Sequence, residues 1–367
     1  MNPACLREAL DLARQGRGQA SPNPLVGAVV VREGHVVGRG FHTWVGVKHA
    51  EILALDQAGE QARGATLYLN LEPCCHQGRT GPCADYVIRA GVSRVVAAMQ
   101  DPNPLVAGEG FRRLRAAGIE VEIASEFTKE AEKLNEAFVH FMRTNRPLVT
   151  LKTALTLDGK IAAPDDNRGW ITSELARAHV QQLRHDSDAI LTGIGTVLAD
   201  DCLLTDRTGL PRSRPLLRVV VDSQLRIPLD SRMIQSARGD LVVVGTSAAS
   251  AERRKALESR AARVLIFDGP GGRADLRRTV EWLGEQKCLS LMIEAGSKVN
   301  WAALEAEIVD KVFFYYGPKI LGGLQSLPMA GGAGRRSRTD AIRVCNLQLH
   351  SIAPDEFAVE GYLRRGD

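Results

Sequence analysis

The chain has 367 residues, of which 44% are hydrophobic and 25% charged, and its formal net charge is +4. This length predicts two domains, and no apolar run approaches the ~20 residues that a membrane-spanning helix needs. The first sixteen residues carry charge throughout and lack the apolar core of a signal peptide. We therefore expect a cytoplasmic protein without a membrane partner.

Charge and cysteine content narrow the function classes further. Residues 1–145 hold 16 Lys and Arg against 16 Asp and Glu, whereas residues 146–367 hold 31 against 27. Binding to a phosphate backbone needs clustered Lys and Arg, so the neutral first half predicts no nucleic-acid partner. Seven cysteines spread over this length favour free thiols or metal ligands over a disulfide scaffold.

The first half alternates helices and strands. Apolar residues at helical spacing predict a helix over 4–16, and the runs SPNPLVGAVVV and HVVGRGF predict a β-hairpin over 21–41. The next elements follow by the same criteria: helix 49–62, strand 65–73, helix 83–91, strand 93–100, helix 108–118 and strand 119–125.

A single amphipathic helix is then predicted from Phe127 to Phe141, with Thr128 as its N-cap. The sequence Asn-Arg-Pro at 145–147 ends this helix, since proline cannot continue it. We place the domain boundary there, which gives domains 1–145 and 146–367.

The second half restarts with short Val-, Ile- and Leu-rich runs. Several are nearly continuous in apolar residues, as expected for strands covered on both faces, and amphipathic stretches at 173–186 and 275–286 predict helices between them. The pattern indicates two α/β domains in tandem. The predicted strands are 148–156, 188–195, 216–223, 240–247, 263–269, 289–296 and 311–320.

Two segments of the first half point to a metal centre: KHAEILAL, at 48–55, and LEPCCHQGRTGPC, at 71–83. A hydrolytic zinc site needs three nitrogen or sulfur ligands and one open position for water, and His49, Cys74 and Cys83 would supply the three. Glu51, two residues from His49, would stand beside the metal and move protons. The general signature of zinc nucleobase deaminases is H-x-E followed by P-C-x-x-C; this chain has H-A-E followed by Pro73-Cys74 and, after a longer spacer, Cys83.

The eight-residue spacer between Cys74 and Cys83 is longer than in a Cys-x-x-Cys turn. It carries His76 and Arg79, and Arg79 could pair bidentately with a phosphate. A structural zinc would need a fourth protein ligand; Cys75 and His76 are the nearby candidates, and Cys75 is too close to Cys74 in sequence to share its tetrahedron.

Together these motifs resemble the bifunctional riboflavin-biosynthesis deaminase–reductase family of bacteria. The resemblance includes PNPLVGAVVV, HAE, LEPCCHQGRTGPC and QDPNPLVAGEG in the first half. It continues in LKTALTLDGKIA, WITS, DAILTGIGTVLADD, RVVVDS, IEAG and GPKILGG, so it covers nearly the whole chain.

The resemblance implies a cytidine-deaminase-like N-terminal domain and a dihydrofolate-reductase-like C-terminal domain, both three-layered. The first would use one zinc ion per chain to remove the 2-amino group of 2,5-diamino-6-(5-phosphoribosylamino)pyrimidin-4-one. The second would use NADPH to reduce the ribosyl chain to ribityl. We also expect a homo-oligomer, a dimer or a tetramer.

The family's site residues carry over to matching positions. In the first domain the resemblance implies substrate contacts for Asn23, His42, His76, Arg79 and Asn103. In the second it implies substrate contacts for Arg168, Arg184, Leu204, Arg207 and Glu294. It implies NADPH contacts for Ala154, Trp170, Thr196, Asp200, Ser223, Gly296, Ser297, Lys298, Val299 and Asn300.

Two residues of the second half are candidates for acid–base work. Lys152 lies among apolar neighbours on a predicted strand, and a desolvated lysine can act as an acid. Asp200 is a candidate acid, base or ribose anchor, whereas Asp201 could cap the next segment. GIGTVLAD lacks a full G-x-G-x-x-G, which argues against a Rossmann domain.

Four positions depart from the family pattern: Cys75, Arg168, Cys202 and the Asp206 that precedes Arg207. Three other interpretations stay open. The first is a tRNA adenosine or cytosine deaminase with an unrelated tail, which the neutral first half disfavours. The second is a non-catalytic zinc module, which has no use for Glu51. The third is a deaminase with a degenerate reductase, which the presence of Lys152 and Asp200 disfavours.

Overall fold

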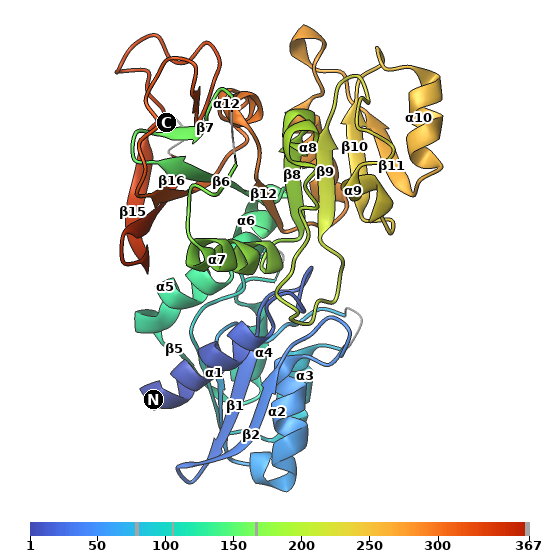
Figure 1. The fold of residues 1–367 in the computed structure, drawn as a ribbon. Helices are drawn as coiled ribbons and strands as arrows, with labels where there is room; N and C mark the ends of the chain where they lie inside the picture. Colours follow the sequence, from blue (N-terminus) through green and yellow to red (C-terminus); the bar gives the residue numbers. More distant parts are fainter. Residues whose placement is uncertain (78–80, 105, 166–167, 364–367) are drawn as a thin grey trace. The chain divides into compact units, whose positions relative to one another are not determined.

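The computed structural model describes residues 1–77, 81–104, 106–165 and 168–363, and the chain divides into two compact units (Figure 1). The first unit comprises Met1–Asn145 together with the segment Pro211–Arg214, and the second comprises Arg146–Leu210 and the residues from Pro215 on. Ser213 donates its N–H to the Gly18 carbonyl at 3.0 Å, which ties that segment into the first unit. Both units mix helices with a sheet, which confirms the predicted α/β class.

The first unit is built on a five-stranded sheet with the order β2-β1-β3-β4-β5. Strand β1 is antiparallel to β2 and to β3, whereas β3, β4 and β5 are parallel. Parallel neighbours place their carboxyl ends on one edge of the sheet, and the loops that follow β3 and β4 leave from that edge. The strands are β1 Gly27–Arg32, β2 His35–Phe41, β3 Thr66–Leu69, β4 Arg94–Ala97 and β5 Glu120–Ile123.

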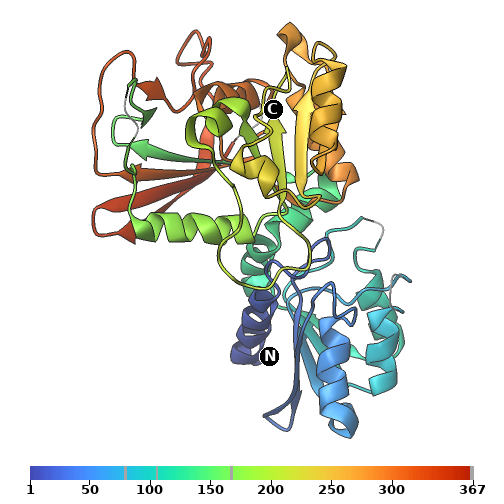
Figure 2. The ribbon, with the colours of Figure 1, turned by 45° about the vertical axis from the view of Figure 1, so that its right-hand side comes forward.

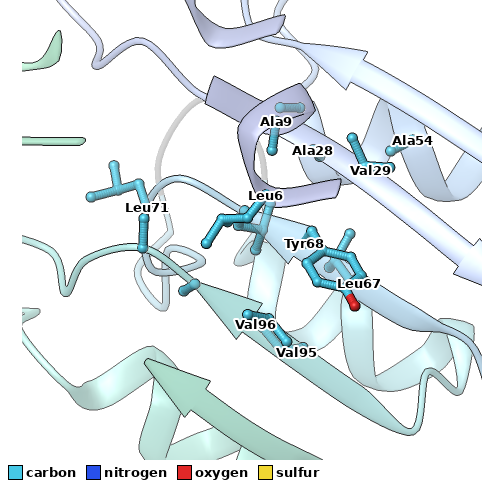
Figure 3. Packing of buried hydrophobic residues seen from close by; sticks show 14 of the residues in the cluster. Leu6, Ala9, Ala28, Val29, Ala54, Leu67, Tyr68, Leu71, Val95 and Val96 are labelled. Atoms are coloured by element: carbon cyan, nitrogen blue, oxygen red, sulfur yellow. The ribbon is translucent and has the colours of Figure 1, made fainter. Parts of the chain in front are cut away.

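Helices cover both faces of this sheet. Helix α1 packs on β1 and β3, whereas α2 packs on β2 and β1 and is followed in the same layer by α3 and α4. These helices are α1 Pro3–Gln15, α2 Ala50–Ala58, α3 Cys83–Ala90 and α4 Glu109–Ala116; the 3₁₀ turn Gly59–Ala62 follows α2. Figure 3 shows Leu6 and Ala9 of α1 among the buried side chains of the strands.

Glycines let these helices approach the strands closely. A Cβ at Gly27 would lie 2.0 Å from the Ala9 carbonyl oxygen of α1, and a Cβ at Gly40 would lie 2.4 Å from the Ala50 carbonyl oxygen of α2. Side chains at neighbouring positions of a strand point to opposite faces. Because Gly40 pairs with Ala28, the neighbour of Gly27, the two glycines face opposite layers.

The prediction of one helix from 127 to 141 was wrong. The structure has α5 Ser125–Leu134 and α6 Glu136–Thr144, separated at Asn135, whose backbone leaves the helical region (φ −105°, ψ 22°). Thr128 lies inside α5 rather than at its N-cap and donates its hydroxyl to the Ala98 carbonyl at 2.7 Å. The apolar spacing continues across the break, so periodicity alone could not reveal it.

The hairpin begins at Gly27 rather than at position 21. The backbone of Leu25 bonds to side chains instead of a neighbouring strand: its N–H donates to Asn135 Oδ1 at 2.8 Å, and its carbonyl accepts from Asn135 and Asn70. Asn70 also accepts the Gly27 N–H at 2.8 Å. These two buried amides hold residues 23–26 as a loop that leads into β1.

The second unit contains a nine-stranded sheet with the order β11-β10-β9-β8-β12-β6-β13-β16-β15. All neighbours are parallel except the pairs that β16 makes with β13 and β15. A short antiparallel pair, β14 with β7, lies beside it. The strands are β6 Leu148–Thr156, β7 Lys160–Ala162, β8 Ala189–Gly193, β9 Leu217–Val221, β10 Leu241–Gly245, β11 Ala262–Ile266, β12 Ser290–Ile293, β13 Lys311–Gly317, β14 Leu327–Pro328, β15 Val344–Ala353 and β16 Glu356–Leu363.

Successive residues of the central strands enter two different cores. In β9, Val219 and Val221 join one buried cluster, which α11 and α12 cover, whereas Val220 joins another beside α8, α9 and α10. Burial on both faces explains the continuous apolar runs and gives the three predicted layers. The helices are α7 Glu174–His185, α8 Ile194–Asp200, α9 Arg232–Gln235, α10 Ala251–Glu258, α11 Leu276–Glu285 and α12 Ser297–Glu305; a 3₁₀ turn spans Pro270–Gly272.

Two features of the second unit differ from the sequence expectations. The strand predicted over 188–195 ends at Gly193, and α8 starts at Ile194. The hairpin of β15 and β16, at the edge of the sheet in Figure 2, was not predicted. Strand β15 is largely exposed and mixes polar with apolar residues, so it lacks the apolar run that marked the other strands.

We predict that Gly27→Ala destabilises the first unit by about 1–3 kcal/mol, the usual cost of overpacking a filled interior, because the new methyl group meets backbone atoms of α1. Urea unfolding of the whole chain would measure the loss. Gly46→Ala is the matched control, since its Cβ would meet the movable Thr43 hydroxyl at 2.7 Å and the Thr43 carbonyl oxygen at an ordinary contact distance of 3.6 Å. Equal stability of the two variants would contradict the prediction.

Candidate functional site

Three separate elements bring the expected metal ligands together. His49 is the N-cap residue of α2, Cys74 lies in the loop after β3, and Cys83 is the first residue of α3. One donor atom from each lies within 4.8 Å of the other two. The imidazole presents Nδ1 to the sulfurs, at 3.0 Å from Cys83 Sγ and 3.6 Å from Cys74 Sγ.

The Cys74 and Cys83 side chains are hydrogen-bonded to each other, and this bond shifts their pKa values in opposite directions. The bond with the Cys83 thiol, helped by the His49 ring and the Cys83 N–H, lowers the pKa of Cys74 to about 4 despite burial. The same bond, together with burial, raises the pKa of Cys83. The Cys83 N–H at the start of α3 lies 3.4 Å from Cys74 Sγ, and helix N-termini stabilise thiolates.

This donor set fits a zinc ion. One imidazole nitrogen and two sulfurs are the ligand types that zinc prefers, and a catalytic site keeps the fourth position open. Within the described ranges, no further His, Cys, Asp or Glu joins these three in a cluster of possible ligands. Cys75 is buried outside the cluster and His76 is exposed. The arrangement therefore has the three-ligand form of a catalytic site.

Glu51 lies in the first turn of α2 and is only 3% exposed. Burial, reinforced by the nearby Cys74 charge, raises the pKa of its carboxyl to about 7. Its Oε2 atom has no hydrogen-bond partner among the described residues. A carboxyl group that takes up and releases protons near neutral pH suits general acid–base catalysis.

Asn23 and His42 lie next to this cluster. His42 Nε2 is 2.9 Å from Asn23 Nδ2, and His42 Nδ1 is 3.0 Å from the Lys48 carbonyl oxygen. Since an amide nitrogen donates and a carbonyl accepts, His42 is neutral with its proton on Nδ1. Its ring meets that of His49 edge-on, with centroids 4.9 Å apart.

Asn103 belongs to a tight loop after β4. Its N–H donates to Asp101 Oδ1 at 2.8 Å, and its carbonyl accepts from Val106 and Ala107. Burial raises the pKa of Asp101 to about 6. Arg79 lies outside the described residues, so the structure does not place its side chain.

In the second unit, the Glu294 carboxylate follows the end of β12 and bonds to two other residues of the expected site, Lys152 and Arg184. Its Oε1 accepts from Lys152 Nζ at 3.1 Å, and its Oε2 accepts from the Arg184 guanidinium at 2.9 and 3.1 Å. The pKa of Glu294 falls to about 2, because the two cations outweigh the effect of burial. Lys152 is 7% exposed, but it has an ionic partner rather than the purely apolar surroundings expected from the sequence.

Leu204 is held in a left-handed conformation, with φ at 51°, which is costly for a branched residue. Two buried arginines fix the carbonyls on either side: Arg184 Nη1 donates to Thr205 and Arg218 Nη1 donates to Leu203, both at 3.1 Å. The sequence analysis missed Arg218, although a charge inside an apolar strand was a signal.

The Asp206 carboxylate bonds to His185 Nδ1 at 2.8 Å and to Thr208, and these bonds lower the pKa of Asp206 to about 2 despite burial. Arg207 is exposed and donates its N–H to Gln181 at 2.9 Å. Arg168 is also exposed.

The expected cofactor residues lie where strands end and helices begin. A Cβ at Gly296 would lie 3.7 Å from Thr196 Oγ1 and a Cβ at Gly193 2.5 Å from Val299, so the starts of α8 and α12 lie close together. Ser223, after β9, accepts the Ala274 N–H at 3.0 Å.

Two side chains at the start of α12 are buried with unsatisfied atoms. Ser297 Oγ and Asn300 Oδ1 have no hydrogen-bond partner in the described part of the chain, and a buried polar atom of this kind marks a place where a ligand can bond. Ala154 is partly buried on β6, and Lys298 is exposed. Trp170 is 67% exposed.

Asp200 and Asp201 differ in their surroundings. Asp200 ends α8, and desolvation raises the pKa of its carboxyl. Asp201 accepts the Arg232 N–H at 2.9 Å at the start of α9, so it bonds to a distant helix rather than to the segment that directly follows it. Cys202, beside them, has a pKa that burial raises to about 11.

None of the helices in the described ranges combines the length and apolar character that crossing a bilayer requires.

Comparisons with known families match both halves of the chain. Residues 2–99 match the cytidine and deoxycytidylate deaminase zinc-binding region, and residues 147–355 match the RibD C-terminal domain. A riboflavin biosynthesis protein RibD from Escherichia coli is 42% identical over 365 residues, which cover 95% of this chain and 96% of that protein. Its counterpart from Actinobacillus pleuropneumoniae is 42% identical over 339 residues, covering 92% and 89%.

Solved structures match over the full length as well. RibD from Acinetobacter baumannii superposes with a TM-score of 0.88 at 35% identity and covers 99% of this chain and 98% of its own. A diaminohydroxyphosphoribosylaminopyrimidine deaminase/5-amino-6-(5-phosphoribosylamino)uracil reductase from Thermotoga maritima gives 0.83 at 34% identity and 98% coverage of both chains.

Fold, site and comparisons define a bifunctional enzyme, with a zinc-binding deaminase domain followed by a reductase domain. The chain belongs to the RibD family of riboflavin biosynthesis proteins. The family resemblance and the fold class expected from the sequence are thereby confirmed.

We predict that Glu294→Gln destabilises the second unit by about 3 kcal/mol or more, because it removes the carboxylate to which the buried Lys152 ammonium and Arg184 guanidinium both bond, and removing one partner of a buried ion pair is strongly destabilising. The pKa of Glu294, about 2, lies below the ordinary value of about 4.3. Its contribution to stability is therefore full above about pH 4.3 and is lost as the pH falls toward 2.

Urea unfolding between pH 3 and 7 would test this, and the variant should show a shallower loss of stability in acid than the wild type. Glu305→Gln removes an exposed carboxylate at the end of α12 and serves as the control. Parallel acid profiles for wild type and Glu294→Gln would contradict the assigned ion pairs.

Proposed function

We propose that residues 1–145 hydrolyse the 2-amino group of 2,5-diamino-6-(5-phosphoribosylamino)pyrimidin-4-one and that residues 146–367 reduce the ribosyl chain of the product with NADPH. The observation that carries the proposal is the cluster of His49, Cys74 and Cys83 with the buried Glu51 carboxyl beside it. The name of the Thermotoga maritima relative describes these two activities and supports the substrate assignment.

In the deaminase domain, His49 Nδ1, Cys74 Sγ and Cys83 Sγ would hold one zinc ion. When bound, zinc makes a water molecule acidic enough to attack near neutral pH. Glu51 would accept a proton from the attacking water at Oε2, the atom without a partner, and pass it to the departing amine. The raised pKa of Glu51, about 7, suits both transfers.

The substrate would lie against two fixed amides. Asn23 and Asn103 would hold the pyrimidine or its sugar, with His42 keeping the Asn23 amide oriented through its 2.9 Å contact. His76 and Arg79, on the loop between Cys74 and Cys83, would bind the phosphate, because an arginine pairs bidentately with such a group.

In the reductase domain, NADPH supplies a hydride when it is bound. Lys152 would donate a proton to the ribose oxygen as the ring opens, and Glu294 would keep its ammonium group in place through the 3.1 Å bond. Asp200 is the second candidate for acid–base work. Three cationic side chains and one fixed loop would bind the substrate phosphate. The cations are Arg168, Arg184 and Arg207, and the loop contains Leu204.

The cofactor would bind at the strand ends that carry the small residues. Backbone N–H groups at the start of α12 favour phosphate groups, and the unpaired atoms of Ser297 and Asn300 could bond to the same ligand. We assign to NADPH the residues Ala154, Trp170, Thr196, Asp200, Ser223, Gly296, Ser297, Lys298, Val299 and Asn300.

The proposed substrate is a small molecule, the compartment is the cytoplasm and the assembly is a homo-oligomer. The balanced charge of residues 1–145 supports an enzyme of small molecules rather than of nucleic acid. We assign the protein to the cytoplasm and expect a dimer or tetramer.

We predict that Glu51→Gln keeps about one zinc per chain and lowers the deamination rate by about 10²–10⁴-fold, the usual contribution of a general acid–base residue. Reduction of the deaminated intermediate should continue at the wild-type rate, because Glu51 belongs to the other domain. Metal analysis, ammonia release and NADPH oxidation would measure the three quantities. Undiminished deamination in this variant would refute the proposed mechanism.

Lys152→Met is predicted to have the opposite effect: deamination continues, but NADPH oxidation falls at least about a hundredfold, since the proton donor is lost. The matched control is Lys311→Met on the neighbouring strand β13, which also removes a buried ammonium bonded to a carboxylate, at 2.7 Å from Glu360. If both variants lost NADPH oxidation to the same extent, Lys152 would act in stability alone and not as the proton donor.

A further inference from the structure

Glu72 is a buried carboxylate that the mechanism above does not use. It lies two residues before the metal-ligand candidate Cys74 and is 3% exposed. Among the described residues no cationic side chain forms an ion pair with it; its hydrogen-bond partners there are backbone N–H groups. A buried charge is expensive unless it is compensated, so these N–H groups must provide the compensation.

Three N–H groups converge on the Glu72 carboxylate. Oε2 accepts from Asp101 at 3.0 Å and from Gly108 at 2.9 Å, and Oε1 accepts from Phe111 at 3.0 Å. Gly108 is the N-cap residue of α4, and Phe111 lies in its first turn. Glu72 therefore caps α4 from a distant part of the sequence, at the helix end where negative charge is favoured.

The same bonds close the loop that carries Asn103. Asp101 and Gly108 bracket this loop, and Glu72 Oε2 holds both of their N–H groups at once. Inside it, Asp101 Oδ1 accepts the Asn103 N–H at 2.8 Å, and the Asn103 carbonyl accepts from Val106 at 3.0 Å. The position of Asn103 thus depends on Glu72 through a short chain of hydrogen bonds.

The start of α4 also lies directly on the metal loop. A Cβ at Gly110 would be 2.1 Å from the Pro73 carbonyl oxygen and 3.1 Å from Glu72 Oε1. Glu72 therefore joins two segments: the loop that bears Cys74 and the loop that bears Asn103.

We propose that Glu72 is a positioning residue for deamination, which sets the affinity for the pyrimidine by fixing Asn103 relative to the metal-binding cysteine. This inference rests on the proposed function, in which Asn103 contacts the substrate. Glu72 itself touches neither the substrate nor the metal, so its loss should weaken substrate binding and leave the chemical step largely unchanged.

Glu72→Gln tests the proposal with little change in size. The amide keeps one acceptor oxygen, but its NH₂ group opposes an N–H donor of the loop or of α4. We expect the KM for the diaminopyrimidine ribotide to rise about tenfold, with kcat within about threefold of wild type and one zinc per chain retained. Glu109→Gln is the matched control: it removes a carboxylate from the same helix turn that bonds instead to Arg112 and Arg113, and its KM should not change.

A double substitution separates positioning from general stability. If Glu72 acts through Asn103, then Glu72→Gln combined with Asn103→Ala should raise KM no further than Asn103→Ala alone, because coupled residues are not additive. Additive effects, an unchanged KM in Glu72→Gln, or loss of zinc from that variant would each overturn the inference.

Wild type and Glu51→Gln distinguish failure of the proposed function from failure of this inference. If the wild-type protein does not deaminate the ribotide, the proposed function and this inference both fail. If wild type and Glu51→Gln behave as predicted but Glu72→Gln keeps the wild-type KM, only the inference fails.

Discussion

The first unit depends on one electrostatic constraint: two neighbouring cysteine sulfurs must be held beside groups that favour negative charge on them. The protein supplies these groups by placing Cys74 beside the His49 ring and against the N–H of Cys83 at the start of α3. A cation that bound to this cluster would bond to the two sulfurs in their deprotonated form, and metal binding at thiols releases protons. The sheet and the helices position the three donor atoms, because β3 leads to Cys74 and the N-terminal ends of α2 and α3 carry His49 and Cys83.

The second unit solves a similar problem with the opposite sign. Here the buried cations of Lys152 and Arg184 need an anion, and Glu294 supplies one oxygen to each. Arg184 also bonds to the loop that contains Leu204. One ion-pair network therefore positions both Lys152, the proposed proton donor, and the Leu204 backbone, which is assigned to substrate binding. Preorganisation of this kind is what a reacting group needs, since a misplaced donor loses much of its effect.

Sequence reasoning located most of the sheet strands and the His49, Cys74 and Cys83 cluster because their signals are local or strongly patterned. Apolar runs marked the strands around Val220, and the motif HAE with two later cysteines marked the zinc site. It failed where one side chain acts at long range: Asn135 divides a helix while it holds Leu25, 110 residues away. Glu72 and Arg218 were missed for the same reason, since a carboxylate or guanidinium that binds distant backbone groups leaves no periodic trace in the sequence.

The assignment of Pro211–Arg214 to the first unit has a consequence for how the enzyme comes apart. The polypeptide passes from one unit to the other three times, so a protease nick after Asn145 would separate Pro211–Arg214 from the backbone of the unit in which they lie, leaving contacts such as the Ser213 bond to Gly18 to link them. Splitting the gene at this point would likewise leave the first product without a piece of its own surface. A domain obtained by cutting the linker alone would lack the Ser213 N–H that its Gly18 carbonyl accepts in the whole chain.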